Sequence, residues 1–74
     1  MTRLPTLSAR KIIKALERAG FVVERQSGSH VILWHPVKKV GTTVPQHGKD
    51  VKRNLMKLIL KQAGLTEAEF EQLL

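Results

Sequence analysis

The 74-residue sequence predicts an α+β fold, a two-layer sandwich whose elements follow the order α-β-β-β-α with a short terminal helix. Three observations predict it. Two segments carry apolar side chains at helical spacing, and the stretch between them is divided by turn residues into three short strand-like runs. Consecutive strands joined by short turns form an antiparallel meander. We therefore expect a three-stranded antiparallel sheet with the flanking helices packed on one face.

The first helix is predicted from Ser8 to Ala19, with Thr6 and Ser8 as candidate N-caps and Gly20 at its end. Its apolar and basic residues fall on opposite sides at a period of 3.6. The apolar side holds Ala9, Ile12, Ile13 and Leu16, and the basic side holds Arg10, Lys11, Lys14 and Arg18. The pattern is typical of an amphipathic helix with a basic outer face.

Three strands are predicted next, over residues 21–26, 30–35 and 42–44. The first two are joined by a glycine turn at 27–29, and a basic turn at 37–41 leads into the third. A proline follows the second strand and another follows the third, which ends each of them because proline lacks the N–H that a sheet needs.

The middle strand is apolar on both faces, which leaves two arrangements open. One face carries His30, Ile32 and Trp34, and the other carries Val31, Leu33 and His35. If helices cover only one face, the other exposes apolar side chains and marks an interaction surface. Alternatively, the terminal segments bury this strand from both sides.

A second helix is predicted from an N-cap at Asp50 to Gly64, followed by a capping-box start at residues 66–69 for a short last helix. The second helix has one basic stripe, at Arg53, Lys57 and Lys61, and is apolar around most of the remaining circumference. A helix that apolar needs two packing partners, and we expect these to be the sheet and the last segment.

Composition limits the function classes. With 42% hydrophobic residues the chain is predicted to be one globular domain spanning residues 1–74. The absence of cysteine excludes disulfides and thiol nucleophiles. The three histidines, His30, His35 and His47, lack the close spacing and the supporting carboxylates of a metal site, so no metal and no other cofactor are expected. No apolar run resembles a signal peptide or a membrane span, which predicts a cytoplasmic protein.

The charge is concentrated in the first 61 residues, which hold all 13 Lys and Arg but only three of the six acids, for a net charge of +10. Such a net positive charge favours binding to nucleic acid, because Lys and Arg neutralise its phosphates. Two other interpretations stay open, a solvated basic surface and a surface for an acidic partner protein.

The tripeptide Gly28-Ser29-His30 is the strongest functional signal from the residues themselves. It predicts a tight turn at the glycine, followed by one histidine at the start of an apolar strand. Histidine exchanges protons near neutral pH, and nearly every other ionisable group nearby is Lys or Arg. This combination indicates acid–base chemistry on a polyanion, although a histidine at a strand start is more often a hydrogen-bonded bystander.

A set of short motifs resembles the HicA family, the small toxins of HicA–HicB toxin–antitoxin modules. The resemblance spans residues 9–65, and the motifs that carry it are Gly20-Phe21, Arg25, Gly28-Ser29-His30, His35-Pro36, Thr43-Val44-Pro45-x-His47 and the run from Ile59 to Leu65. Family members are described as mRNA interferases with a fold like that of double-stranded-RNA-binding domains. The predicted order of elements agrees with that fold.

The resemblance implies the toxin of a type II toxin–antitoxin system, a metal-independent endoribonuclease that cleaves mRNA and arrests translation and growth. It implies His30 as the catalytic residue and a HicB-type antitoxin as the neutralising partner, hence a hetero-oligomer. RNA supplies its own nucleophile, the 2′-hydroxyl, so an imidazole that moves protons can suffice without a metal.

The predicted RNA-binding residues are Gly28, Ser29, Lys38, Lys39 and Lys49. Gly28 lets a backbone approach closely, and Ser29 offers a hydroxyl or an amide to a phosphate. The three lysines, with His47, are candidates for electrostatic support or for a second proton carrier, and the sequence does not choose among them.

Two other functions remain open at this point, a non-catalytic double-stranded-RNA-binding module and a basic protein–protein interaction module. We expect His35, before a proline, to be structural. Trp34 is interpreted as a core or partner contact rather than as a stacking platform for bases, because the chain has no tyrosine and two phenylalanines to assist it.

Overall fold

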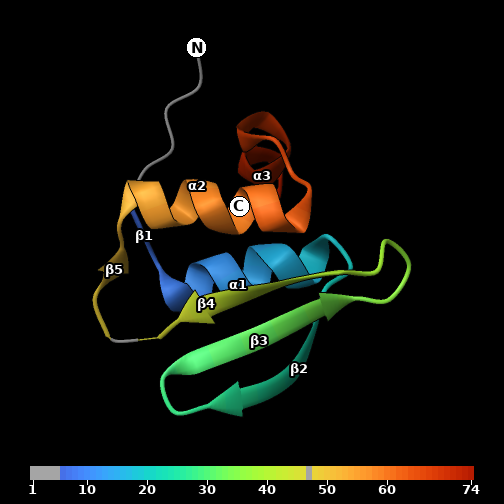
Figure 1. The fold of residues 1–74 in the computed structure, drawn as a ribbon. Helices are drawn as coiled ribbons and strands as arrows, with labels where there is room; N and C mark the ends of the chain where they lie inside the picture. Colours follow the sequence, from blue (N-terminus) through green and yellow to red (C-terminus); the bar gives the residue numbers. More distant parts are fainter. Residues whose placement is uncertain (1–5, 47) are drawn as a thin grey trace.

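The computed structural model describes residues 6–46 and 48–74, and it confirms the predicted α+β architecture. Figure 1 shows a layer of helices above a sheet of three strands. The antiparallel sheet has the order β2-β3-β4. Its strands are β2 (Val22–Ser27), β3 (His30–His35) and β4 (Val40–Pro45), and the helices are α1 (Ala9–Arg18), α2 (Arg53–Ala63) and α3 (Glu67–Gln72).

Two short strands were not predicted, and they correct the start of the second helix. In the structure β1 (Leu7–Ser8) pairs antiparallel with β5 (Asp50–Val51). Asp50 was predicted as the N-cap of the second helix, and this is wrong, because Asp50 is paired with Ser8 and Lys52 holds the N-cap. The extended pairing places Val51 in the core, where it is 4% exposed, so the helix begins two residues later than predicted.

The start of α1 agrees with the prediction. Of the two candidate caps, Ser8 is the N-cap, and its side-chain oxygen accepts a hydrogen bond from the Lys11 N–H at 3.3 Å. The helix buries three of the four residues predicted for its apolar side, leaves Ile13 half-buried, and keeps its basic side exposed. The buried residues are Ala9, Ile12, Ala15 and Leu16.

The helices cover one face of β3, which decides between the two arrangements left open by the sequence. Val31, Leu33 and His35 are buried, whereas His30 and Trp34 are exposed and Ile32 is half-buried. We call the second side the open face of the sheet. Across it, His30, Ile32 and Trp34 pair with Pro45, Thr43 and Gly41 of β4.

Helix α2 has the two packing partners that its apolar circumference predicts, the sheet at β4 and the short helix α3. Phe70 of α3 is fully buried in the same core cluster as Met56 and Ile59 of α2. The capping box predicted for α3 is present, with Thr66 and Glu69 bonding reciprocally. Within the part of the chain that the structure describes, no helix has the length and apolarity required to cross a membrane.

Candidate functional site

The turn between β2 and β3 requires its glycine. Gly28 has φ +59°, in the left-handed region that glycine adopts most easily, and a Cβ built there meets nothing within 4 Å. Its carbonyl accepts a hydrogen bond from the Gln26 side-chain amide at 3.3 Å. The Ser29 carbonyl accepts from the Gln46 backbone N–H, which ties the turn to the end of β4. The turn therefore has free space around the Gly28 Cα, and a backbone hydrogen bond joins it to the end of β4.

His30 begins β3 and lies at the rim of a hollow of about 420 Å³. Strands β3 and β4 form one wall of this hollow and helix α2 forms the other. Its lining residues are His30, Thr43 and Pro45 from the sheet, with Leu55, Leu58, Ile59 and Gln62 from α2. An exposed imidazole in a cleft of this size can reach a substrate that enters between sheet and helix.

Two further hollows share lining residues with the first, and we call the three together the His30 groove. One, of about 500 Å³, shares Pro45 and Leu55 with the His30 hollow and also contains Lys49, Asp50 and Lys52. The other, of about 420 Å³, lies over the open face of β3 and β4 and reaches Trp34. It shares Thr43 and Gln62 with the His30 hollow.

One predicted lysine lines the hollow next to that of His30, and two others lie at the far end of β3. Lys49 lines the His30 groove beside the N-terminus of α2, and Lys52, which the sequence analysis did not single out, joins it there. Lys38 and Lys39 lie in the turn that follows β3, at the opposite end of the strand. Five residues separate His30 from His35, a length of about 17 Å in an extended strand. His47 falls outside the described residues.

The His30 hollow offers few groups for proton transfer besides the imidazole itself. Among the described residues that line it, Thr43 and Gln62 carry polar side chains, and neither a carboxylate nor a lysine is present. In residues 6–46 and 48–74 there is also no group of three metal-ligating side chains. The arrangement is suited to proton exchange at one imidazole, with positive charge supplied from the adjoining hollow.

Gln62 was not predicted as a site residue, although it lies in the run from Ile59 to Leu65 that carries the resemblance. In the structure it joins two of the three hollows. The buried Thr42 hydroxyl donates to the Gln62 Oε1 at 2.9 Å, which fixes the amide beside β4. This bond engages the amide oxygen as acceptor, and the donors of the amide are the two N–H groups of Nε2.

His35 has a structural place in the fold. Its Nδ1 accepts a hydrogen bond from the Lys38 N–H at 3.0 Å, so the ring proton is on Nε2, which lies 3.1 Å from the Ala19 carbonyl oxygen. The ring also packs edge-on against Phe21 at a centroid distance of 5.1 Å. The imidazole thus joins the end of β3 to the end of α1, away from the His30 groove.

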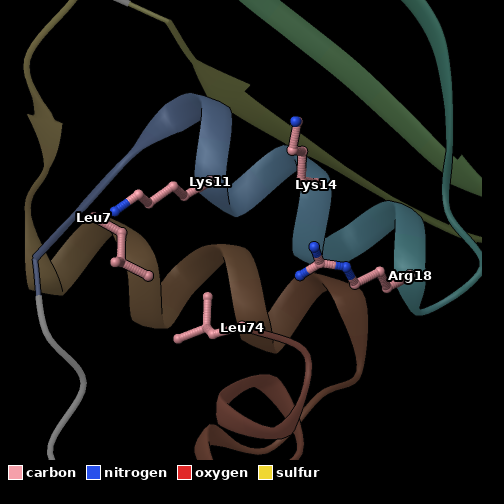
Figure 2. Close-up of a pocket in the computed structure, with 5 residues that line it drawn as sticks. All are labelled: Leu7, Lys11, Lys14, Arg18 and Leu74. Atoms are coloured by element: carbon pink, nitrogen blue, oxygen red, sulfur yellow. The ribbon is translucent and has the colours of Figure 1, made fainter.

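A separate basic hollow of about 320 Å³ lies beside α1. Figure 2 shows Lys11 extending toward Leu7, Arg18 lying between α1 and the C-terminal segment, and Lys14 pointing away from Leu74. Arg18 donates to the Leu73 carbonyl at 2.6 Å. None of the residues that line this hollow also lines the His30 groove. Its described lining offers three cations but no histidine and no carboxylate side chain.

Comparison with known proteins gives one family. A family model described as "HicA toxin of bacterial toxin-antitoxin" matches residues 9–65, which is more than half of the chain. The match includes α1, the three strands of the main sheet and α2, and it stops before α3. No curated protein matches the chain.

Proposed function

This chain belongs to the HicA family of toxins from bacterial toxin–antitoxin systems, and we propose that it is a metal-independent endoribonuclease that cleaves mRNA through His30. The observation that carries the proposal is the position of His30, exposed in a cleft whose adjoining end holds Lys49 and Lys52. A proton-exchanging group next to a cationic pocket is what cleavage of an RNA phosphodiester requires.

The chemistry uses the nucleophile that RNA contains. His30 takes the proton of a 2′-hydroxyl as its oxygen bonds to the neighbouring phosphorus, and the 5′-oxygen leaves with a proton from water or from the imidazolium. The products are a 2′,3′-cyclic phosphate and a 5′-hydroxyl. Lys49 neutralises the charge that grows on the phosphorane oxygens.

The proposed RNA contacts follow the His30 groove and the turn before it. The Gly28 backbone is open to a phosphate because no side chain covers it, and Ser29 adds a hydroxyl beside it. Lys38 and Lys39, at the far end of β3, contact the RNA backbone at a distance from the cut rather than at the scissile phosphate.

The partner of a toxin in this family is an antitoxin, and we propose that a HicB-type antitoxin neutralises this chain by covering the His30 groove. Leu55 and Leu58 line the groove and are 36% and 48% exposed. Burying such side chains against a partner is favourable, at about 25 cal/mol per Å² of apolar surface. Occupancy of the groove excludes RNA from His30.

The test compares the wild-type chain with a His30→Ala variant on a long RNA. We expect the variant to lose cleavage by about 10²-fold or more, the usual contribution of a general acid–base group, while it still binds RNA. Val37→Ala is the control, because Val37 is 83% exposed and lies in the turn at the other end of β3. Cleavage is followed by gel electrophoresis and by the chemistry of the RNA ends.

The outcomes separate the functions that the sequence left open. RNA that is bound but remains intact with the wild-type chain contradicts the ribonuclease and favours a double-stranded-RNA-binding module. A chain that neither binds nor cleaves RNA favours a protein–protein interaction module. Growth arrest on expression, relieved by His30→Ala and by a co-expressed antitoxin, is the corresponding result in cells.

A further inference from the structure

We propose that the hollow between Trp34 and Gln62 is a nucleobase subsite, which binds the unstacked base of a nucleotide flanking the cleaved bond. The inference rests on the proposed ribonuclease function and adds to it the residues that select the RNA sequence. It concerns the end of the His30 groove opposite to Lys49 and Lys52.

The hollow lies at a suitable distance from His30. Trp34 is four residues along β3 from His30, which is about 13 Å in an extended strand and on the same face of the sheet. The two hollows share Thr43 and Gln62, so a short single strand can occupy both without leaving the protein surface. The volume of about 420 Å³ lies within the range of small-ligand sites.

Trp34 supplies an aromatic surface at this hollow. It is 37% exposed and lies outside the core cluster, so its ring is not needed to fill the interior. The residue opposite it on β4 is Gly41, where an added Cβ would approach the Trp34 Cε3 to 3.1 Å. The ring therefore lies against bare backbone, in a position that a larger residue at 41 would disturb. Every base has a π-face that such a ring can stack on.

The hollow is suited to a base rather than to a phosphate. Among the described residues that line it, Glu24 is the one with a charged side chain, and a carboxylate repels phosphate. Glu24 is the extra residue of a bulge in β2, between Val23 and Arg25. The lysines of the groove line the hollow on the other side of His30. The charges thus direct phosphates toward Lys49 and bases toward Trp34.

The polar groups of the hollow indicate which bases it prefers. The Gln62 oxygen accepts from Thr42 and its amide N–H groups are donors, whereas the Glu24 carboxylate carries only acceptors. A base that offers both an exocyclic amine and an acceptor satisfies both side chains. Adenine, cytosine and guanine carry such an amine, whereas the one donor of the uracil ring edge, N3–H, lies between two carbonyl oxygens that a carboxylate repels. We expect preference for an amino-bearing base over uracil at this position.

Trp34 is the only tryptophan of the chain, so its fluorescence reports directly on the subsite. The His30→Ala chain is titrated with single-stranded hexamers of adenylate, cytidylate and uridylate, while anisotropy of end-labelled hexamers measures total binding. We expect saturable quenching of the Trp34 emission and binding of the uridylate hexamer that is about fivefold weaker, the effect of one net hydrogen bond.

Two variants test whether Trp34 and Gln62 are responsible for hexamer binding and base preference. Trp34→Leu is expected to weaken binding of all three hexamers by about tenfold through lost stacking. Gln62→Glu keeps the acceptor for the Thr42 hydroxyl but replaces the donors, so it is expected to change the base preference and the cleavage sites on long RNA. Val37→Ala is again the control, and circular dichroism verifies that each variant is folded.

The results distinguish this subsite from the proposed function. Hexamers that bind without changing the Trp34 emission, or cleavage sites that neither variant moves, overturn the subsite and leave the ribonuclease standing. Failure of the chain to bind or cleave any RNA overturns both.

Discussion

At the scale of single residues, Gly20 and His35 lie too close together for any side chain at position 20. Gly20 has φ +104°, and a Cβ built there would lie 2.7 Å from the Nε2 of His35. The same Nε2 lies 3.1 Å from the Ala19 carbonyl oxygen. The imidazole therefore cannot move aside without losing the contact that joins the end of β3 to α1. Both the backbone angle and the space at position 20 require glycine.

Gly20→Ala is expected to destabilise the fold by about 2 kcal/mol or more, because it adds a steric clash to the strain of a left-handed residue. Urea denaturation measures the loss. Gly64→Ala is the matched control, since Gly64 has φ +72° but nothing lies within 4 Å of its added Cβ. It is expected to lose about 1 kcal/mol, from backbone strain alone. Equal losses at the two positions would contradict the role given to His35.

At the scale of elements, the start of α2 is unusual for a stable helix. Its N-cap is Lys52, which makes no side-chain capping bond, and no acidic residue lies in its first turn. Arg53 instead places positive charge next to the positive end of the helix dipole. This is unfavourable for the isolated helix and favourable for attracting phosphate to the end of the His30 groove.

Replacing Lys52 separates these two effects. Lys52→Ser introduces a capping hydroxyl at a residue that already has the extended backbone of an N-cap, and is expected to stabilise the fold by about 1 kcal/mol. Lys52→Ala removes the same charge without adding a cap. We expect both variants to bind RNA more weakly and only the serine variant to gain stability in urea. If both variants were more stable in urea than the wild-type chain, the gain would come from the loss of positive charge rather than from capping.

The capping box of α3 predicts a pH dependence. The backbone N–H of Thr66, and then its side chain, hydrogen-bond to Glu69 and hold the pKa of that carboxyl below its ordinary value of 4.5. A lowered pKa in the folded state stabilises the fold above the unfolded value, and this contribution is lost as the pH falls through the lowered value. Acid should therefore weaken the start of α3.

The test is thermal unfolding at pH 7 and pH 3. The Glu69→Gln variant keeps an acceptor for the Thr66 N–H but cannot titrate, so it is expected to lose less stability on acidification than the wild-type chain. Glu67→Gln changes the charge in the same turn without touching the box, and should behave as wild type. Thr66→Ala is expected to lose about 1 kcal/mol at pH 7.

At the scale of the whole molecule, the positive charge is divided between two sides. Lys49 and Lys52 line the His30 groove, whereas Lys11, Lys14 and Arg18 line the separate hollow beside α1. A net charge of +7 attracts RNA from any direction, but only cations that touch phosphate release counterions on binding. The salt dependence of binding can therefore show which side the RNA occupies.

Lys49→Ala is expected to reduce the slope of log Kd against log salt concentration by about 0.7, the contribution of one phosphate contact on a single strand. The measurement uses labelled RNA with a His30→Ala background, so that the ligand stays intact. Lys11→Ala removes an equal charge on the other side and should leave the slope unchanged. Equal effects of the two variants would mean that RNA is not confined to the groove.

The elements were largely predictable because each has a local signal. The apolar period in α1, the turn at Gly28 and the capping box at Thr66 depend on residues close in sequence, and the structure confirms all three. The start of α2 was not predictable from such signals, since Asp50 is a good cap by type. Its place in β5 depends on Ser8, 42 positions earlier in the chain.

The sequence by itself determined the order of the three helices and of the three strands of the main sheet, the family, the excess of positive charge, and the position of His30 at the start of a strand after a glycine turn. Only the tertiary structure decided which face of β3 stays open, and that Lys49, Lys52 and Gln62 line the groove near His30 while Lys38 and Lys39 do not. The reason is physical. Periodicity and turn chemistry act over a few residues, whereas a groove exists only once α2 has packed beside β4.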